Sequence, residues 1–316
     1  MAVARPSIAS EGTSSVVEQA WFRRAAEGLF SVLFPSDCRI CGLPLLNISR
    51  LPVCPDCLGD IQPVRGKTCS ICGERVLSVY AEYADDGLRR CPVCRRVDHP
   101  FERAVSYGSY DGGLRELIHL LKYNGVRPAA EVLGRMLAEA LISLDRSLPQ
   151  ENVLVIPVPL YTGKRRQRGF NQAELIARAA VKVCAQRERF HLASDILLRT
   201  RDTHSQIGLT SHQRRENLRG AFAVARATAV TGRAVLLVDD VYTTGTTASE
   251  CARVLRRAGA SQVWVATVAR TLKLASKYVD LGETDGPEPG FKVSEFQGFK
   301  GETELLESKD LETLKP

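Results

Sequence analysis

Two adjacent aspartates, Asp239 and Asp240, follow a run of branched apolar residues and precede a turn rich in threonine. The stretch 235–250 reads VLLVDDVYTTGTTASE, which predicts a buried strand that ends at the acids and a helix that begins after the turn. In an open α/β sheet, ligands bind beyond the carboxyl ends of the strands. The two carboxylates are therefore expected at a ligand-binding edge.

The turn after the aspartates has the composition of an anion-binding site. Its residues are Thr243, Thr244, Gly245, Thr246 and Thr247. Main-chain amides and the dipole of the following helix favour an anion, and glycine lets the backbone approach a phosphate closely. The carboxylates would repel a phosphate in direct contact, so we expect them on sugar hydroxyls or on a magnesium ion. The implied ligand is a ribose 5-phosphate. A plain strand–turn–helix with Asp and Thr as helix caps is the alternative.

A cluster of positive charge follows an earlier predicted strand. The segment 156–177 reads IPVPLYTGKRRQRGFNQAELIA, and Lys164, Arg165, Arg166 and Arg168 lie together just before Gly169. We expect a basic loop at the same edge of the sheet as the aspartates. A solvated loop without a ligand is the alternative.

Four C-x2-C pairs lie between residues 38 and 94, separated by 12, 11 and 18 residues. Two such pairs supply the four thiolates of a tetrahedral metal site, so the segment predicts two sites. Zinc is favoured over iron–sulfur clusters, and disulfides are disfavoured because no secretory signal is present. Sequential pairing is preferred to interleaved pairing because gaps of 12 and 18 residues each fit a ribbon hairpin. The predicted ligand sets are Cys38, Cys41, Cys54 and Cys57 for one ion, and Cys69, Cys72, Cys91 and Cys94 for the other.

Strands alternating with helices surround these motifs. Helical periodicity is present at 112–125, 129–144, 171–186 and 246–260, and continuous apolar runs at 152–160, 233–240 and 262–270 predict strands. Strands of this kind are typical of a parallel sheet that is covered on both faces. The fold class is therefore α/β, and residues 200–219 are expected to form a polar, arginine-rich loop.

The composition changes along the chain and divides it into four expected segments. We expect a 1–34 extension with an amphipathic helix, a 35–100 double zinc ribbon, a 101–272 α/β domain that carries the ligand site and a 273–316 disordered acidic tail. From residue 271 onward the sequence has six Lys and ten acidic residues, whereas the preceding part has 37 basic and 26 acidic residues. A basic body suits phosphate-rich partners. No apolar run is long enough to span a membrane, and no signal peptide is evident, so a cytoplasmic location is expected.

Several of these stretches together resemble the ComF/GntX family of phosphoribosyltransferase-like proteins, which is associated with DNA uptake. The stretch VLLVDDVYTTGTT looks like the phosphoribosyl pyrophosphate (PRPP) motif of type I phosphoribosyltransferases. The cysteine pairs and the stretches LRELIHLLKYNG, PVPLYTGKRRQRGFNQ and THSQIGLTSHQRRENLRGAF add to the resemblance, which covers roughly residues 30–272. It implies a type I phosphoribosyltransferase fold preceded by a small double zinc ribbon.

The resemblance also implies roles for the site residues. Asp239 and Asp240 would bind the ribose 2- and 3-hydroxyls and favour a positive sugar ring, and Thr243 to Thr247 would surround the 5-phosphate. Lys164, Arg165 and Arg168, with magnesium, would stabilise departing pyrophosphate. PRPP is the expected ligand, and single-stranded DNA and a competence helicase are candidate partners. The alternative to an enzyme is a non-catalytic, single-stranded-DNA-binding competence factor with a regulatory PRPP site.

Overall fold

The computed structural model describes residues 37–45, 49–76, 88–203 and 211–272. The amphipathic helix expected within residues 1–34 and the tail expected at 273–316 lie outside these residues. In the part of the chain that is described, none of the helices has both the length and the apolar character that a bilayer crossing needs.

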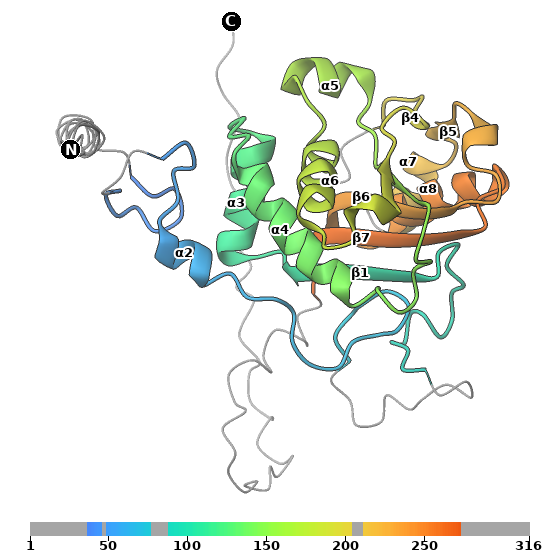
Figure 1. Ribbon diagram of the computed structural model, residues 1–316, viewed down its shortest axis with the longest axis horizontal. Helices are drawn as coiled ribbons and strands as arrows, with labels where there is room; N and C mark the ends of the chain where they lie inside the picture. Colours follow the sequence, from blue (N-terminus) through green and yellow to red (C-terminus); the bar gives the residue numbers. More distant parts are fainter. Residues whose placement is uncertain (1–36, 46–48, 77–87, 204–210, 273–316) are drawn as a thin grey trace, which may run out of the picture. The chain divides into compact units, whose positions relative to one another are not determined.

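A five-stranded parallel sheet forms the centre of the fold (Figure 1). Its strands lie in the order β1-β7-β6-β2-β3. The strands are β1 (Arg103–Ser109), β2 (Val153–Pro157), β3 (Phe190–Leu192), β6 (Ala234–Tyr242) and β7 (Gln262–Arg270). All five residues of β2 are buried, as are eight of the nine in β7, because both faces of the sheet are covered. The predicted parallel α/β sheet is confirmed.

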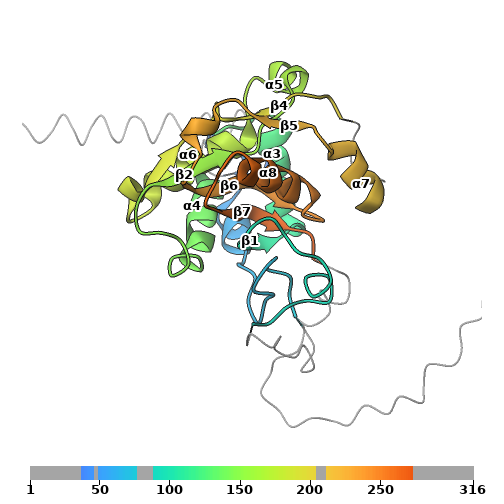
Figure 2. The ribbon, with the colours of Figure 1, turned by 90° about the vertical axis from the view of Figure 1, so that its right-hand side faces the viewer.

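Helices cover the two faces of the sheet (Figure 2). One face carries α3 (Gly112–Lys122), α4 (Ala129–Ile142) and α6 (Gln172–Val183), whose apolar residues pack with Leu236 and Val238 of β6. The opposite face carries α8 (Thr246–Arg257), which packs with Val235 and Leu237. Alternate residues of β6 thus belong to two separate cores.

Two expected loops contain helices. The basic segment after β2 forms α5 (Thr162–Arg168), a seven-residue helix that ends at Gly169 in a left-handed conformation. The segment expected as a loop at 200–219 contains α7 (Ser211–Leu218), and residues 204–210 lie outside the described part. The other elements are β4 (Leu197–Arg199), β5 (Phe222–Val224), which pairs with β4 antiparallel, and two 3-10 turns, Arg187–Arg189 and Ala227–Ala229.

The cysteine-rich segment has little regular structure. It contains the short helix α2 (Pro55–Gly59) and two isolated antiparallel bridges, Asp37 with Pro44 and Thr68 with Arg75. Its two halves pack on different cores. Cys38 belongs to the core on the α3 and α4 side, whereas Cys69, Cys72, Cys91 and Cys94 belong to the core on the α8 side.

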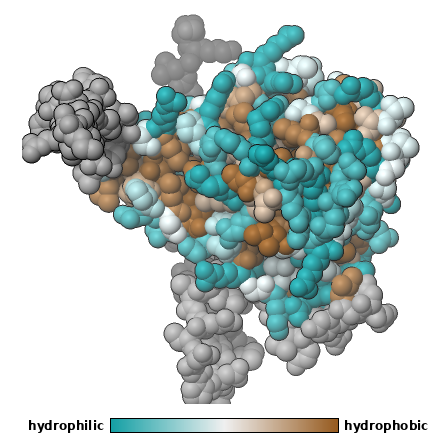
Figure 3. All heavy atoms as spheres, in the orientation of Figure 1, coloured by the Kyte–Doolittle hydropathy of each residue, from teal (hydrophilic) through white to brown (hydrophobic). Residues whose placement is uncertain are grey.

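Polar residues dominate the surface that carries α3, α4 and α6, and apolar residues reach the surface between them (Figure 3). Ile142 and Val183, near the ends of α4 and α6, are 72% and 50% exposed. They line a groove of about 540 Å³ between these two helix ends.

Candidate functional site

Asp240 is buried near the carboxyl end of β6 and forms an ion pair with Lys122, the last residue of α3. The two side chains are 6% and 16% exposed. Two buried charges are tolerated in a protein interior when they are paired with each other. Lys122, at the end of α3, therefore neutralises Asp240, one of the two predicted ligand-binding carboxylates.

Asp239 leaves the opposite face of the strand, because successive side chains of a strand alternate. Its carboxylate accepts a hydrogen bond from the main-chain amide of Asp240 at 2.9 Å and lies in the electrostatic field of Arg199, from β4. Any single ligand that touches both carboxylates must therefore lie across the carboxyl edge of the sheet.

Burial shifts the titration of the groups in this cluster. It raises the pKa of Asp239 to about 6, against the opposing attraction of Lys122 and Arg199. It lowers the pKa of Lys122 to about 8, an effect that Asp239 opposes and Arg168 reinforces. Burial also lowers the pKa of Arg168 and of Arg199. Such perturbed groups cluster at functional sites more often than elsewhere.

The threonine turn follows β6 directly and leads into α8. Thr243 and Thr244 are exposed, Thr246 and Thr247 are partly buried, and Gly245 has a φ of 75° as the N-cap of the helix. The Thr244 and Thr246 hydroxyls lie 2.8 Å apart, so they share a hydrogen bond. The N-terminus of this twelve-residue helix favours an anion through its dipole and its main-chain amides.

Glycine is required at position 245 for two reasons. A positive φ is strained for any residue with a side chain. A Cβ atom there would also overlap the hydroxyl of Tyr242, the last residue of β6. The turn is thus held tightly against the end of the strand.

Arg168 is the one cation of α5 that the structure brings to the acidic cluster. Its guanidinium donates to the Gln172 side-chain oxygen at 2.6 Å and lies over the Tyr123 ring at 5.7 Å. Asn171 caps α6 by accepting from the Ala173 amide, and its own side-chain amide donates to the Val158 carbonyl. These bonds fix the start of α6 against the end of β2 and so set the position of Arg168.

The other predicted cations of α5 point elsewhere. Lys164, Arg165 and Arg166 are exposed, and Arg165 lies 4.0 Å from the Glu174 carboxylate. Within the described ranges, no hydrogen bond or ion pair joins Lys164 or Arg165 to Asp239 or Asp240. Their predicted contact with pyrophosphate stays a prediction.

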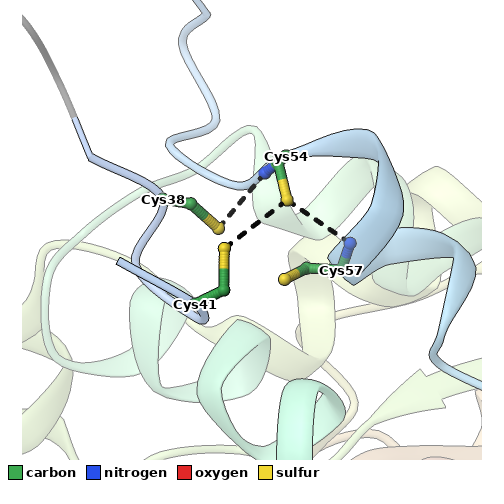
Figure 4. A group of neighbouring side chains, drawn as sticks. All are labelled: Cys38, Cys41, Cys54 and Cys57. Atoms are coloured by element: carbon green, nitrogen blue, oxygen red, sulfur yellow. Dashed lines mark hydrogen bonds between the residues drawn. The ribbon is translucent and has the colours of Figure 1, made fainter. Parts of the chain in front are cut away.

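The two cysteine groups have the predicted sequential pairing. Within each group of four, the sulfur atoms all lie within 4.8 Å of one another. Cys38 and Cys41 come from a loop and Cys54 and Cys57 from the start of α2, with their side chains turned toward a common centre (Figure 4). The Cys54 sulfur accepts from the Cys57 amide, and the Cys38 sulfur accepts from the Cys54 amide. Each group could hold a metal ion, as a double zinc ribbon requires.

Sequence reasoning missed Lys122 and Arg199. Lys122 lies in the stretch LRELIHLLKYNG, which contributed only to a family resemblance. The available signal was its position on α3, where it aligns with Leu114, Leu117, Ile118 and Leu121 on the buried side of the helix. A lysine on that side indicates a buried partner of opposite charge.

The phosphoribosyl transferase domain family matches residues 179–287 of the chain. The DNA utilization protein YhgH of Salmonella typhi is 31% identical over 244 residues, which are 75% of this chain and 98% of that protein. Competence protein F of Haemophilus influenzae is 30% identical over 69% of this chain and 96% of its own length. Competence protein ComFC of Bacillus subtilis is 26% identical over 66% of this chain and 79% of its own length. These matches agree with the parallel sheet and the two cysteine groups.

Proposed function

This chain belongs to the ComF/YhgH family of competence and DNA-utilisation proteins, and from that premise we propose that it binds PRPP at the carboxyl edge of its sheet. On transfer, the bond from the sugar C1 to pyrophosphate breaks and a bond from C1 to an acceptor forms. The observation that carries the proposal is the placement of Asp239 and Asp240 near the end of β6, which continues through Val241 and Tyr242 into the threonine turn that leads to α8.

The turn is proposed to bind the 5-phosphate. Its main-chain amides and threonine hydroxyls can donate to phosphate oxygens, and it carries no charge that would repel them. Asp239 and Asp240 are proposed to accept from the ribose hydroxyls. Their negative charge also favours the positive character that the sugar ring develops as pyrophosphate departs.

Arg168 is proposed to stabilise the departing pyrophosphate, with Lys164 and Arg165 on the exposed side of α5. The carboxylate oxygens of Asp239 and Asp240 are donors that suit magnesium. A magnesium ion held there would offset the charge of the pyrophosphate. Asp240 is held in a direct ion pair by Lys122, whereas Asp239 is attracted by Lys122 and Arg199 without a direct ion pair to either, so Asp239 is the better placed of the two for such an ion.

Calorimetric titration of the full chain with PRPP and magnesium tests this proposal. We expect saturable binding, and we expect Asp239→Asn with Asp240→Asn to abolish it while leaving the metal content of the cysteine groups unchanged. Normal PRPP binding by the double variant would refute the site assignment. A screen of bases and amines for pyrophosphate release then tests transfer.

Zinc is the metal that we propose for both cysteine groups. Four thiolates at the usual Zn–S distance in a tetrahedron place their sulfur atoms about 3.8 Å apart. The Cys41 and Cys54 sulfurs lie 3.8 Å apart, and the Cys72 and Cys91 sulfurs 3.7 Å apart. Elemental analysis is expected to give two zinc ions per chain, and one after Cys41→Ser or Cys91→Ser.

Single-stranded DNA binding is the second candidate function, in which a PRPP site would serve regulation. A groove of about 920 Å³ near the start of α4 and along α6 is lined by Arg50, Arg127, Arg178 and Lys182, with Glu131 as its one acidic residue among those described. Next to it, Tyr123 is 68% exposed, a surface on which a base can stack. This arrangement favours a phosphate backbone with unpaired bases.

Binding of a labelled oligonucleotide at several salt concentrations tests this function. We expect affinity to fall steeply with salt, and the Arg127→Glu, Arg178→Glu pair to weaken binding at every salt concentration. Unchanged affinity of the double variant would exclude this groove as the DNA site. A competence helicase stays a predicted partner, to be tested by co-purification, and a cytoplasmic location also stays a prediction.

A further inference from the structure

Arg270 ties the second cysteine group to the end of β6. It is the last residue of β7 and is 2% exposed. Its guanidinium donates to the Cys72 carbonyl oxygen and to the Glu74 carboxylate, the latter at 2.7 Å. The same guanidinium lies over the Tyr242 ring, 5.2 Å from its centre. One buried side chain thus contacts both the loop that carries a metal ligand and the residue before the threonine turn.

The loop between Cys72 and Glu74 has no room to shift. Gly73 has a φ of 70°, and a Cβ atom there would lie 2.9 Å from the Ala104 carbonyl oxygen and 3.4 Å from the Arg270 guanidinium. The Ala104 amide also donates to the Ile71 carbonyl oxygen at 2.6 Å. The second cysteine group is therefore pressed against β1 and Arg270.

Tyr242 carries the contact onward to the turn. It is 5% exposed, and its hydroxyl occupies the space in which a side chain at Gly245 would have to lie. The main-chain amide of Thr271 donates to the Tyr242 carbonyl oxygen at 2.9 Å, which holds the ends of β6 and β7 together. A displacement of Arg270 would thus change the packing of Tyr242 and, through it, the position of Gly245.

A cavity of about 760 Å³ separates the cysteine group from the turn. Its lining includes Cys72, Cys91, Cys94 and His99 of the cysteine-rich segment together with Thr243 and Thr244 of the turn. The second cysteine group is therefore a wall of the space beside the turn.

Among the described residues, the first cysteine group makes no hydrogen bond to Arg270, Tyr242 or the threonine turn. It lies near the start of α3, where a Cβ at Gly113 would lie 3.5 Å from the Cys57 carbonyl oxygen, and Cys38 belongs to the core on the α3 and α4 side. Each group offers four thiolates of its own, so the first group can serve as a control for the second.

We propose that metal bound by the second cysteine group positions the threonine turn through Arg270 and Tyr242, so that metal occupancy and anion binding at the turn are coupled. The first group is not coupled to the turn. The proposal rests on the proposed function in naming the turn as an anion site, and Arg270 and Tyr242 act as positioning residues. Coupling of this kind is reciprocal. If the bound metal raises the affinity of the turn for an anion by some factor, a bound anion raises the affinity of the cysteine group for the metal by the same factor.

Zinc release from the full chain to a zinc-selective chelator, with and without PRPP and magnesium, tests the coupling. Without PRPP, two release steps are expected. PRPP is expected to slow one step at least tenfold and to leave the other unchanged. Cys41→Ser should keep the PRPP-sensitive step, and Cys91→Ser should remove it. Arg270→Lys should still bind two zinc ions but should lose the effect of PRPP.

The outcomes separate this proposal from the proposed function. If PRPP binds but slows neither step, or slows both equally, the coupling is wrong and the PRPP site stands. If PRPP does not bind, the proposed function fails, and hydrogen exchange of the amides at 243–249 decides the link between the metal group and the turn. We then expect Cys91→Ser to accelerate that exchange at least tenfold relative to Cys41→Ser, with the amides of α4 unchanged in both.

Equal exchange at 243–249 in the two variants would overturn the proposal. If Cys91→Ser also accelerates exchange in α4, the variant has unfolded, and Arg270→Lys takes its place. Faster exchange of the turn in Arg270→Lys with both zinc ions retained supports the link, and unchanged exchange refutes it.

Discussion

Lys122 and Asp240 form an ion pair between the end of α3 and the end of β6, with both side chains mostly buried. The pair joins a helix on one face of the sheet to the strand that carries the proposed ligand-binding acids. Burial lowers the pKa of Lys122, and the positive charge of Arg168 lowers it further, so Arg168 also belongs to this cluster.

Removing the ammonium group should therefore destabilise the fold strongly. Lys122→Met keeps most of the side-chain volume but leaves the Asp240 carboxylate buried without its partner, at an expected loss of about 3 kcal/mol in the free energy of unfolding. Urea denaturation measures this loss. The double variant Lys122→Met, Asp240→Asn should regain at least half of it, and equal destabilisation of the single and double variants would contradict a direct interaction.

Asp239 should make stability depend on pH in a defined window. Its pKa is raised from 3.8 to about 6 in the folded state, so between about pH 4 and pH 6 the folded chain binds more protons than the unfolded chain. The contribution of this carboxyl to stability therefore falls as the pH rises through that window. We expect Asp239→Asn to match the natural chain near pH 4 and to be more stable at pH 7 by about 1–2 kcal/mol. A stability difference that is the same at both pH values would contradict a raised pKa of Asp239.

Gly245→Ala should disturb the fold more than Gly232→Ala, although the two glycines have a similar φ. Gly232 has a φ of 72°, and a Cβ atom added there would have no neighbour within 4 Å, whereas Gly245 adds the overlap with Tyr242. We expect Gly232→Ala to cost about 1 kcal/mol and to leave PRPP binding unchanged. Gly245→Ala should cost more and weaken PRPP binding at least tenfold, as measured by denaturation and calorimetry. Equal effects of the two substitutions would show that the contact with Tyr242 is unimportant.

Gly134→Ala should destabilise the fold, although alanine is usually favoured over glycine inside a helix. Gly134 lies inside α4, where a Cβ atom would overlap the Cβ of Ala179 on α6. In an exposed helix the substitution would stabilise by about 1 kcal/mol. Here we expect a loss of about 1–3 kcal/mol, because α4 and α6 would have to move apart. A gain in thermal stability would contradict this close packing of the two helices.

Residues with a strong local pattern allowed much of this fold to be predicted. The apolar runs of β2, β6 and β7 identified the parallel sheet, and the spacing of the cysteines identified both groups and their sequential pairing. β1 was missed because RAVSYGS mixes polar residues and glycine with its apolar ones. An edge strand that pairs only with β7 does not need a continuous apolar run.

Contacts between distant parts of the chain cannot be predicted from a local sequence pattern. Nothing near Lys122 in the sequence indicates Asp240 as its partner, and nothing near Glu74 indicates Arg270. The helix α5 was expected as a loop because its exposed, charged face gives no apolar periodicity.

The place of β7 in the sheet has a consequence for the order of events during synthesis. β7 lies between β1 and β6, and β1 has no other partner in the described sheet. Until the ribosome has added residues 262–270, β1, which directly follows the cysteine-rich segment, has no partner strand in the described sheet. β7, the last strand among the described residues, therefore completes the sheet, and a chain interrupted before it would leave unpaired strand edges open to other nascent chains.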